Sequence, residues 1–137
     1  MPLVLASAIL GSALAASCAG SVHPASPIPV EVWRSGDDGL TLKFAEALDT
    51  AFEASPIFCK GRGKQPGTVI VTIPSNVAWK QIGKRVRVSY KVAYTDTADR
   101  PLGTAAGRCW EDDLSKCATE VVKRAEAAAR DLSRVRR

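Results

Sequence analysis

Histidine is nearly absent from this chain of 137 residues, because His23 is the only one. It lies beside Pro24, before the first charged residue. Histidine is the usual general base, activates serine and cysteine nucleophiles, and is a common ligand of catalytic zinc. A chain whose only histidine lies outside the expected folded domain is a poor candidate for all three chemistries. We therefore expect a protein that is not an enzyme and that holds no metal and no cofactor.

Charge is absent from the first 30 positions, since all 33 charged residues follow Val30. Residues 3–16 form an apolar run that fits the hydrophobic region of a secretory signal and is shorter than the ~20 residues of a membrane-spanning helix. No later run is as long and as apolar. The sequence therefore predicts a signal peptide over residues 1–17, secretion across the inner membrane, and no transmembrane span in the mature chain.

Two processing schemes fit the end of the apolar run. In the first, the Ala-Leu-Ala of residues 13–15 is accepted by a general signal peptidase, and the secreted product begins near Ala16. In the second, residues 15–18 resemble the lipobox of bacterial lipoproteins, in which Cys18 becomes the lipidated first residue. The two schemes differ in what happens to the sulfur of Cys18.

We favour lipidation of Cys18 because of the composition of the next segment. Residues 18–29 are uncharged and contain several prolines and serines, which is typical of an extended tether. A cysteine at the head of a tether is poorly placed to pair with one in a folded domain, whereas a lipid anchor needs a flexible spacer. Ala19 after the cysteine suggests an outer-membrane anchor, with the domain facing the periplasm.

The folded domain is expected over residues 30–132. Residues 29–34 alternate apolar and polar side chains, as a short strand does. A helix is expected over residues 40–52, where apolar residues recur at helical spacing. Asp37 or Asp38 is available to cap its first turn, and the chain breaks after it at Pro56.

Three further strands are expected after this helix. The clearest is residues 85–94, where valines and tyrosines alternate with basic and small residues, so that one face is core and the other is wet and cationic. Residues 68–73 are a β-branched run. The turn at residues 95–101 returns the chain as a hairpin into residues 102–110.

The last element is a helix that begins at the acidic residues 111–113, where the helix dipole favours anions, and carries one apolar stripe. Residues 133–137 are left as a basic tail. The predicted fold class is α+β, in the order β-α-β-β-β-α. Its sheet is expected to be antiparallel, with both helices packed on one face.

Three cysteines lie in this domain, and an oxidising compartment allows them to pair. Cys109 and Cys117 are separated by seven residues, a loop short enough for a disulfide between the last strand and the last helix. A bond from Cys59 to either of them is the alternative, and three free thiols are the third possibility. The spacing is not that of a zinc site.

Carboxylates occur as residues 37–38, as Asp96 with Asp99, and as residues 111–113. Two such groups would suffice for a glycosidase. However, each lies at a helix start or in a turn, where an anion or a turn former is expected in any case. We assign catalysis to none of them.

Basic residues fall into three groups. These are a glycine-rich loop (Lys60, Arg62, Lys64), the central hairpin (Lys80, Lys84, Arg85, Arg87, Lys91) and the carboxy-terminal residues 123–137. The loop lacks the spacing of a phosphate-binding loop, and the tryptophans are not interleaved with basic residues as in RNA-binding proteins. We therefore expect no nucleic acid as partner.

An anionic envelope protein, polymer or lipid is the expected partner instead. We predict that Arg85, Arg87 and Lys91 bind it. The alternative is a solvated sheet face that only keeps a small basic protein in solution.

The Phe-Ala-Glu-Ala-Leu run within residues 44–52 is followed by Ser-Pro-Ile-Phe at residues 55–58 and by the expected hairpin into residues 102–103. This order of motifs resembles that of small bacterial envelope proteins and lipoproteins of unknown function. The order is also similar to the amino-terminal domain of the Tol-system translocation protein, where a helix ends shortly before a small-residue-x-Phe step. The resemblance covers residues 40–132 and implies a non-enzymatic envelope adaptor, but it transfers no functional residue.

These features predict a periplasm-facing lipoprotein that acts as a binding or assembly module for an anionic macromolecule and contacts the membrane only through its lipid anchor. The rival hypothesis is a secreted inhibitor or immunity protein that blocks a toxin or a hydrolase. An unlipidated product and a protruding, rigid loop would favour the rival.

Overall fold

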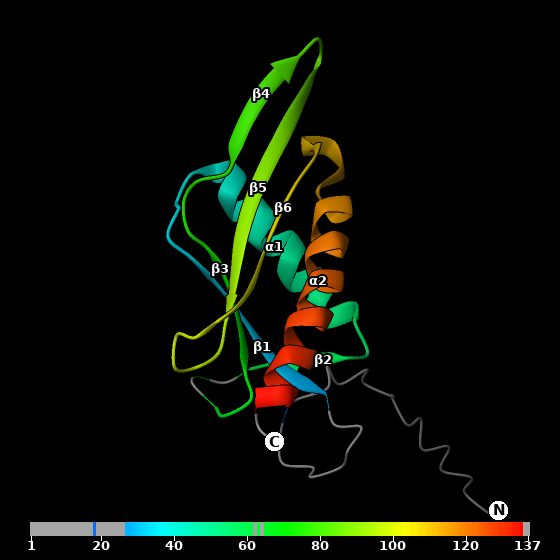
Figure 1. The fold of residues 1–137 in the computed structure, drawn as a ribbon. Helices are drawn as coiled ribbons and strands as arrows, with labels where there is room; N and C mark the ends of the chain where they lie inside the picture. Colours follow the sequence, from blue (N-terminus) through cyan, green and yellow to red (C-terminus); the bar gives the residue numbers. More distant parts are fainter. Residues whose placement is uncertain (1–17, 19–26, 62, 64, 136–137) are drawn as a thin grey trace, which may run out of the picture.

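A mixed sheet of six strands carries two helices on one face (Figure 1). The computed structural model describes residue 18 and residues 27–61, 63 and 65–135. The elements are β1 (Ile28–Arg34), α1 (Gly39–Ala54), β2 (Phe58–Lys60), β3 (Val69–Ile73), β4 (Ala78–Ile82), β5 (Arg85–Thr95), β6 (Pro101–Trp110), a 3-10 turn (Glu111–Asp113) and α2 (Leu114–Val135). The predicted α+β class and the packing of both helices on one face are confirmed.

The sheet is mixed, so the prediction of a purely antiparallel sheet is wrong. β1 runs parallel to both β2 and β3, whereas β3, β4 and β6 run antiparallel to β5. The reason lies in α1, which follows β1, packs against the sheet and returns the chain to the end where β1 began. A strand that comes after such a crossover pairs in parallel.

Two strands are not predicted by the sequence pattern. β2 has only three residues, too few for a periodic pattern. All five residues of β4 are exposed, so this strand has no buried face to mark it by alternation. α2 extends to Val135, so residues 133–135, which the sequence pattern assigns to the basic tail, are helical.

Some predictions concern residues outside the described part of the chain. They are the signal peptide at residues 1–17, most of the tether at residues 19–26 together with His23, and the end of the tail at residues 136–137. Among the described residues, no helix is both long and apolar enough to cross a membrane.

One core joins both helices to the same face of the sheet. Phe44, fully buried on α1, stacks on Tyr90 of β5 with their ring centroids 5.2 Å apart. Tyr94, four residues further along β5, donates a hydrogen bond of 2.7 Å to the backbone carbonyl of Val121 in α2. The Val/Tyr alternation of β5 is thus the seam to which both helices attach.

The two tyrosines of this seam differ in how their hydroxyls are satisfied. Burial raises the pKa of both Tyr90 and Tyr94 above the usual range. Within the described residues, the hydroxyl of Tyr90 is buried without a hydrogen-bond partner. Its ring lies against Gly107 of β6, where a Cβ would come within 2.8 Å of the hydroxyl oxygen. Gly107 therefore makes room for the ring.

Residues 74–77, which we call the β3–β4 crossover, connect two strands that pair with the same edge of β5. Asn76 ties this segment to the start of α1. Its side-chain oxygen Oδ1 accepts hydrogen bonds from the backbone N–H groups of Asp37 (2.9 Å) and Asp38 (3.3 Å). Gly36 is buried against Asn76, and a Cβ at that position would collide with it. The crossover is therefore held away from the sheet by a specific contact with α1.

The start of α1 is capped as predicted, and Asp38 is the capping residue. Its carboxylate accepts a hydrogen bond of 2.7 Å from the backbone N–H of Thr41. Hydrogen bonds from Thr41 hold the pKa of Asp38 below its usual range. The buried Thr41 hydroxyl in turn accepts the backbone N–H of Val77 at 3.0 Å, which adds a second tie to the crossover.

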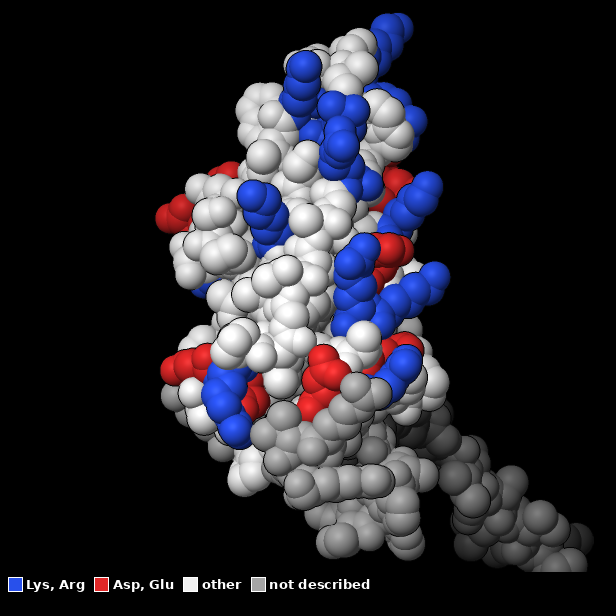
Figure 2. All heavy atoms as spheres, in the orientation of Figure 1, with Lys and Arg blue, Asp and Glu red and all other residues white. Residues whose placement is uncertain are grey.

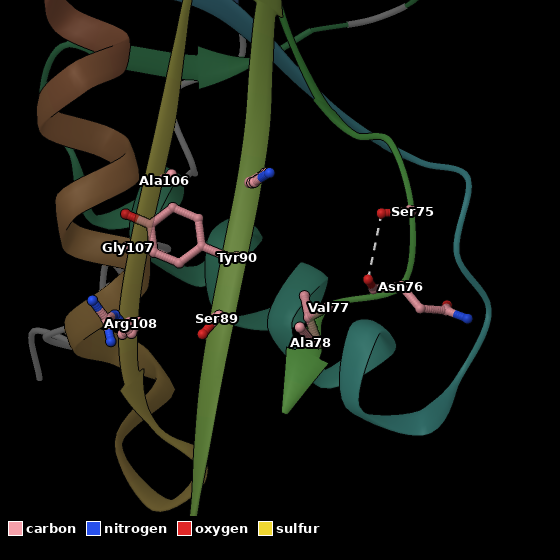
Figure 3. Close-up of a pocket in the computed structure, with 10 residues that line it drawn as sticks. Ser75, Asn76, Val77, Ala78, Ser89, Tyr90, Ala106, Gly107 and Arg108 are labelled. Carbon is pink, nitrogen blue, oxygen red and sulfur yellow. Dashed lines mark hydrogen bonds between the residues drawn. The ribbon is translucent and has the colours of Figure 1, made fainter. Parts of the chain in front are cut away.

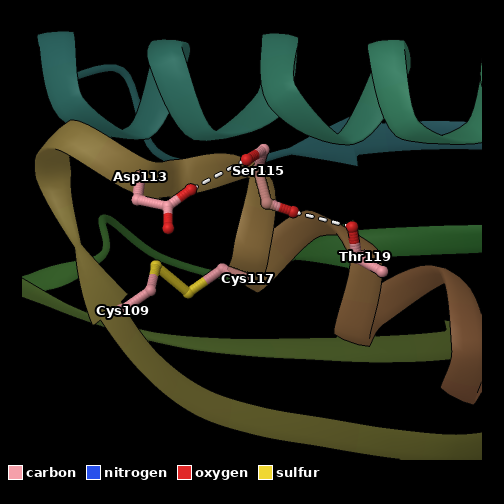
Figure 4. Close-up of a disulfide and its surroundings, with 5 residues drawn as sticks. All are labelled: Cys109, Asp113, Ser115, Cys117 and Thr119. Carbon is pink, nitrogen blue, oxygen red and sulfur yellow. Dashed lines mark hydrogen bonds between the residues drawn. A yellow bond between two sulfur atoms is a disulfide. The ribbon is translucent and has the colours of Figure 1, made fainter.

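A disulfide between Cys109 and Cys117 joins the end of β6 to the first turns of α2, with the two Cα atoms 5.8 Å apart (Figure 4). The short loop between these cysteines includes Ser115, whose hydroxyl donates to the Asp113 carboxylate at 2.9 Å. The bond links a sheet edge to the helix that covers it.

A second disulfide joins Cys18 to Cys59 in β2, with a Cα–Cα distance of 5.5 Å. The expectation that Cys18 stands apart from the folded domain is therefore wrong. A sulfur in a disulfide cannot also carry a lipid thioether, so this bond and lipidation of Cys18 exclude each other. Of the two predicted processing schemes, the one in which the product begins near Ala16 is compatible with this disulfide. Two disulfides in a chain of this size indicate an oxidising environment.

Replacing Asn76 with Ala should test the tie between the crossover and α1. Asn76→Ala removes the acceptor for two backbone N–H groups, and we expect a loss of ~1 kcal/mol in the free energy of unfolding. Ser75→Ala is the matched control and should change it by less than about 0.5 kcal/mol, as surface substitutions usually do. Urea denaturation measures both, and equal stability of the two variants would contradict the role given to Asn76.

The two tyrosines make a second matched pair. Tyr94→Phe should lower the free energy of unfolding by ~1 kcal/mol, whereas Tyr90→Phe should be neutral or stabilising, because its hydroxyl has no partner to lose. Their raised pKa values mean that the folded state keeps protons that the unfolded chain releases above pH ~10. Stability should therefore fall as the pH rises past that value, and less so in the double variant. The opposite order of the single variants would contradict this assignment.

Candidate functional site

A cationic face lies on the side of the sheet that carries no helix. The alternation of β5 directs Arg85, Arg87 and Lys91 away from the Val/Tyr core, as predicted. Lys80 lies opposite Arg87 on β4, and Arg108 lies opposite Ser89 on β6. In Figure 2, Lys and Arg gather at the upper end of the molecule, over β4 and β5. We define the cationic face as Lys80, Arg85, Arg87, Lys91 and Arg108.

Most of these charges are not neutralised. Within the described part of the chain, no carboxylate lies within 4.0 Å of Lys80, Arg87, Lys91 or Arg108. Lys80 and Arg87 even occupy directly opposite positions, where like charges destabilise a strand pair. The face therefore presents an uncompensated positive potential to solvent, and an anionic partner would relieve the repulsion.

Arg85 is an exception among the three predicted partner-binding residues. Its guanidinium donates to both carboxylate oxygens of Asp112, at 3.2 Å from Nε and 2.7 Å from Nη2. It also lies 4.2 Å from the ring centroid of Trp110. The hydrogen bond from Arg85 lowers the pKa of Asp112. Arg85 is thus paired within the molecule, in an ion pair at the surface. Arg87 and Lys91 are the members of the predicted set that have no carboxylate partner among the described residues.

Sequence reasoning missed Arg108. It lies in an Ala/Gly-rich strand, where no alternation of large apolar residues marks the faces. The available signal was the hairpin itself, because a turn at residues 96–100 fixes which residues of β5 and β6 face each other. Asp96 stabilises this turn by accepting hydrogen bonds from the backbone N–H groups of Ala98 (2.8 Å) and Arg100 (2.9 Å).

The other carboxylates are also used locally. Asp96 forms an ion pair of 2.7 Å with the Arg100 side chain, and the hydrogen bonds from Arg100 and Ala98 lower its pKa. Glu111 lies 3.8 Å from Lys43 of α1. Across the described ranges, no three His, Cys, Asp or Glu side chains are grouped in a way that could hold a metal ion. Four pockets formed by the described residues each include residues from at most one of the three predicted carboxylate groups.

A hollow of about 490 Å³ opens on the cationic face (Figure 3). One wall is the segment between β3 and β4, including Ser75, together with Ala78 at the start of β4. The opposite side consists of β5 and β6, with Ser89, Lys91 and Arg108 among its lining residues. The side chain of Asn76 is directed away from β5, which leaves the space between the crossover and the sheet open (Figure 3).

The hollow lies where one edge of β5 has no pairing partner. β3 pairs with β5 as far as Thr72 opposite Ala93, and β4 begins with Ala78 opposite Ser89. Between these positions, residues 90–92 have no ladder partner on this edge, although β6 pairs with them on the other. The crossover therefore creates both the hollow and a short gap in the sheet.

No protein-family model matches this chain, and no curated protein is significantly similar to it in sequence.

Freeing Arg85 should strengthen binding of polyanions. Asp112→Asn removes the carboxylate that neutralises Arg85, whereas Asp113→Asn makes the same change of net charge at a carboxylate that pairs with Ser115 instead. We expect the Asp112 variant to elute from a heparin column at higher salt than the Asp113 variant, because exposed charges attract anions over about a Debye length of ~10 Å in 0.1 M salt. Equal shifts would mean that only net charge matters.

Proposed function

We propose that this protein is a secreted, non-enzymatic binding module of the bacterial envelope that holds an anionic macromolecular partner through its cationic face. The observation that carries the proposal is that Arg87, Lys91 and Arg108 lie on the helix-free face without carboxylate partners among the described residues. Electrostatic complementarity of this kind mainly provides specificity and a fast association rate.

The two disulfides support a periplasmic or extracellular setting, because such bonds persist in oxidising compartments. A lipid anchor on Cys18 is not part of the proposal, since the bond to Cys59 occupies its sulfur. A role as an envelope adaptor also agrees with the resemblance to the Tol-system amino-terminal domain, which remains a proposal.

The β4–β5 hairpin supports a second candidate function, that of a secreted inhibitor or immunity protein. It extends beyond the helices at one end of the molecule (Figure 1). Trp79 and Ile82 on β4 are 61% and 38% exposed. Large apolar side chains on a protruding hairpin are suited to fill a pocket of another protein, and aromatic residues often dominate such interfaces. Trp79→Ser should abolish inhibition in this case and should leave binding by the cationic face intact.

Two charge-matched double variants test the main proposal. Arg87→Ser with Lys91→Ser removes two charges from the cationic face, whereas Lys123→Ser with Arg130→Ser removes two exposed charges from α2. In affinity capture from native envelope, the first pair should weaken retention by about tenfold, equivalent to ~1.4 kcal/mol, and should reduce its salt sensitivity. The α2 pair should have little effect.

Equal retention of both double variants and the unaltered protein would contradict a partner-binding role for the cationic face. Circular dichroism of each variant is the control for folding.

A further inference from the structure

The floor of the hollow has a simple side-chain pattern. Ser89 pairs with Arg108 across β5 and β6, and Lys91 pairs with Ala106 in the next row of the same face. Small and cationic side chains thus alternate on a square of four positions. Diagonal neighbours in such a square are ~7–8 Å apart, within reach of long side chains. The two cations can therefore converge on one group above Ser89 and Ala106.

The chemistry of the lining fits an anion that accepts hydrogen bonds. Lys91 and Arg108 supply positive charge, and Ser75 and Ser89 supply hydroxyl groups. No Asp or Glu is among the described residues that line the hollow, so neither cation is neutralised from within it. Hydrogen bonds from charged donors to a carboxylate are about twice as strong as neutral ones.

The gap in the sheet distinguishes a polypeptide from other anions. Residues 90–92 of β5 have no ladder partner on the edge that faces the hollow. β3 and β4 occupy the same edge on either side of this gap, so a bound peptide can pair there over about one residue. The backbone N–H and C=O groups of that residue are the groups that β-strand addition uses. A lipid bilayer or a flat polymer surface lacks these groups and cannot enter the recess beside the crossover.

A second copy of this chain is a poor occupant. The surface around the hollow is the cationic face, and bringing two such faces together would place like charges against each other. The hollow, at about 490 Å³, is within the size range of specific binding sites.

We propose that the hollow receives an extended acidic segment of a partner polypeptide, with one carboxylate side chain seated between Lys91 and Arg108. The proposal rests on the proposed function, because it names the class of the anionic partner and the part of the cationic face that recognises it. The segment enters the gap between β3 and β4 with one residue, whose backbone can pair with β5 at residues 90–92 and whose acidic side chain lies over Ser89 and Ala106.

Filling the hollow without changing charge tests the proposal. Ala106→Trp adds bulk on the exposed floor, whereas Thr104→Trp adds the same bulk one row away on the same strand and face, outside the lining. The probe is a blocked peptide of alternating threonine and glutamate, and calorimetry measures its affinity. We expect Ala106→Trp to weaken binding by about tenfold and Thr104→Trp to leave it within about twofold.

A second variant covers the case in which Ala106→Trp disturbs the fold. Lys91→Gln with Arg108→Gln removes both cations and should weaken binding of the glutamate peptide by tenfold or more, because charge-assisted hydrogen bonds are the strong ones. The analogous peptide of threonine and glutamine should bind weakly to every variant.

The outcomes separate this proposal from the broader one. If the Arg87/Lys91 variant loses the native partner but Ala106→Trp and Thr104→Trp bind the peptide alike, the hollow proposal is overturned and the binding role of the face stands. Binding of the glutamine peptide as tightly as the glutamate peptide would overturn the carboxylate assignment. Tighter hollow-dependent binding of inorganic phosphate or phosphatidylglycerol vesicles would overturn the choice of a polypeptide.

Discussion

The hydrogen bonds that Asn76 accepts from Asp37 and Asp38 determine where the chain leaves β3 and re-enters the sheet as β4. Without this tie to α1, residues 74–77 would be free to continue along the edge of β5. Because they are drawn toward α1, β3 and β4 contact separate stretches of that edge. The hollow, the unpaired stretch of β5 and the protruding β4–β5 hairpin all depend on this one junction. A contact made beside a helix cap thus shapes the candidate binding surface.

The parts of the fold that could be predicted from the sequence are those with strong periodicity. The Val/Tyr alternation of β5 and the helical stripe of α1 each bury one face, and burial imposes the period. β4 could not be predicted because it is exposed on both faces, and β2 is too short to show a pattern. The parallel pairing of β1 was missed because the direction of the next strands depends on the path that the chain takes through α1, and this path leaves no mark on composition.

The residues of the candidate site also separate into those that the sequence pattern predicts and those that it does not. Arg87 and Lys91 could be assigned to the wet face because they alternate with core residues. Arg108 required the register of the β5–β6 hairpin, and the pairing of Arg85 with Asp112 required a contact between residues 27 positions apart. Cys18 was misjudged for a similar reason, since a proline-rich composition does not reveal that this cysteine lies beside β2. Local pattern identifies faces, whereas partners across the fold decide which charges are free.

If the helix-free face and its hollow bind an anionic partner, the backbone that lines them should be protected when the partner is bound. Amide hydrogen exchange with and without the blocked threonine–glutamate peptide measures this directly, because exchange reports the protection of individual backbone groups. We expect added protection around residues 75–78, 89–92 and 106–108. Protection confined to α1 or α2, with these three segments unchanged, would contradict the assignment of the binding surface.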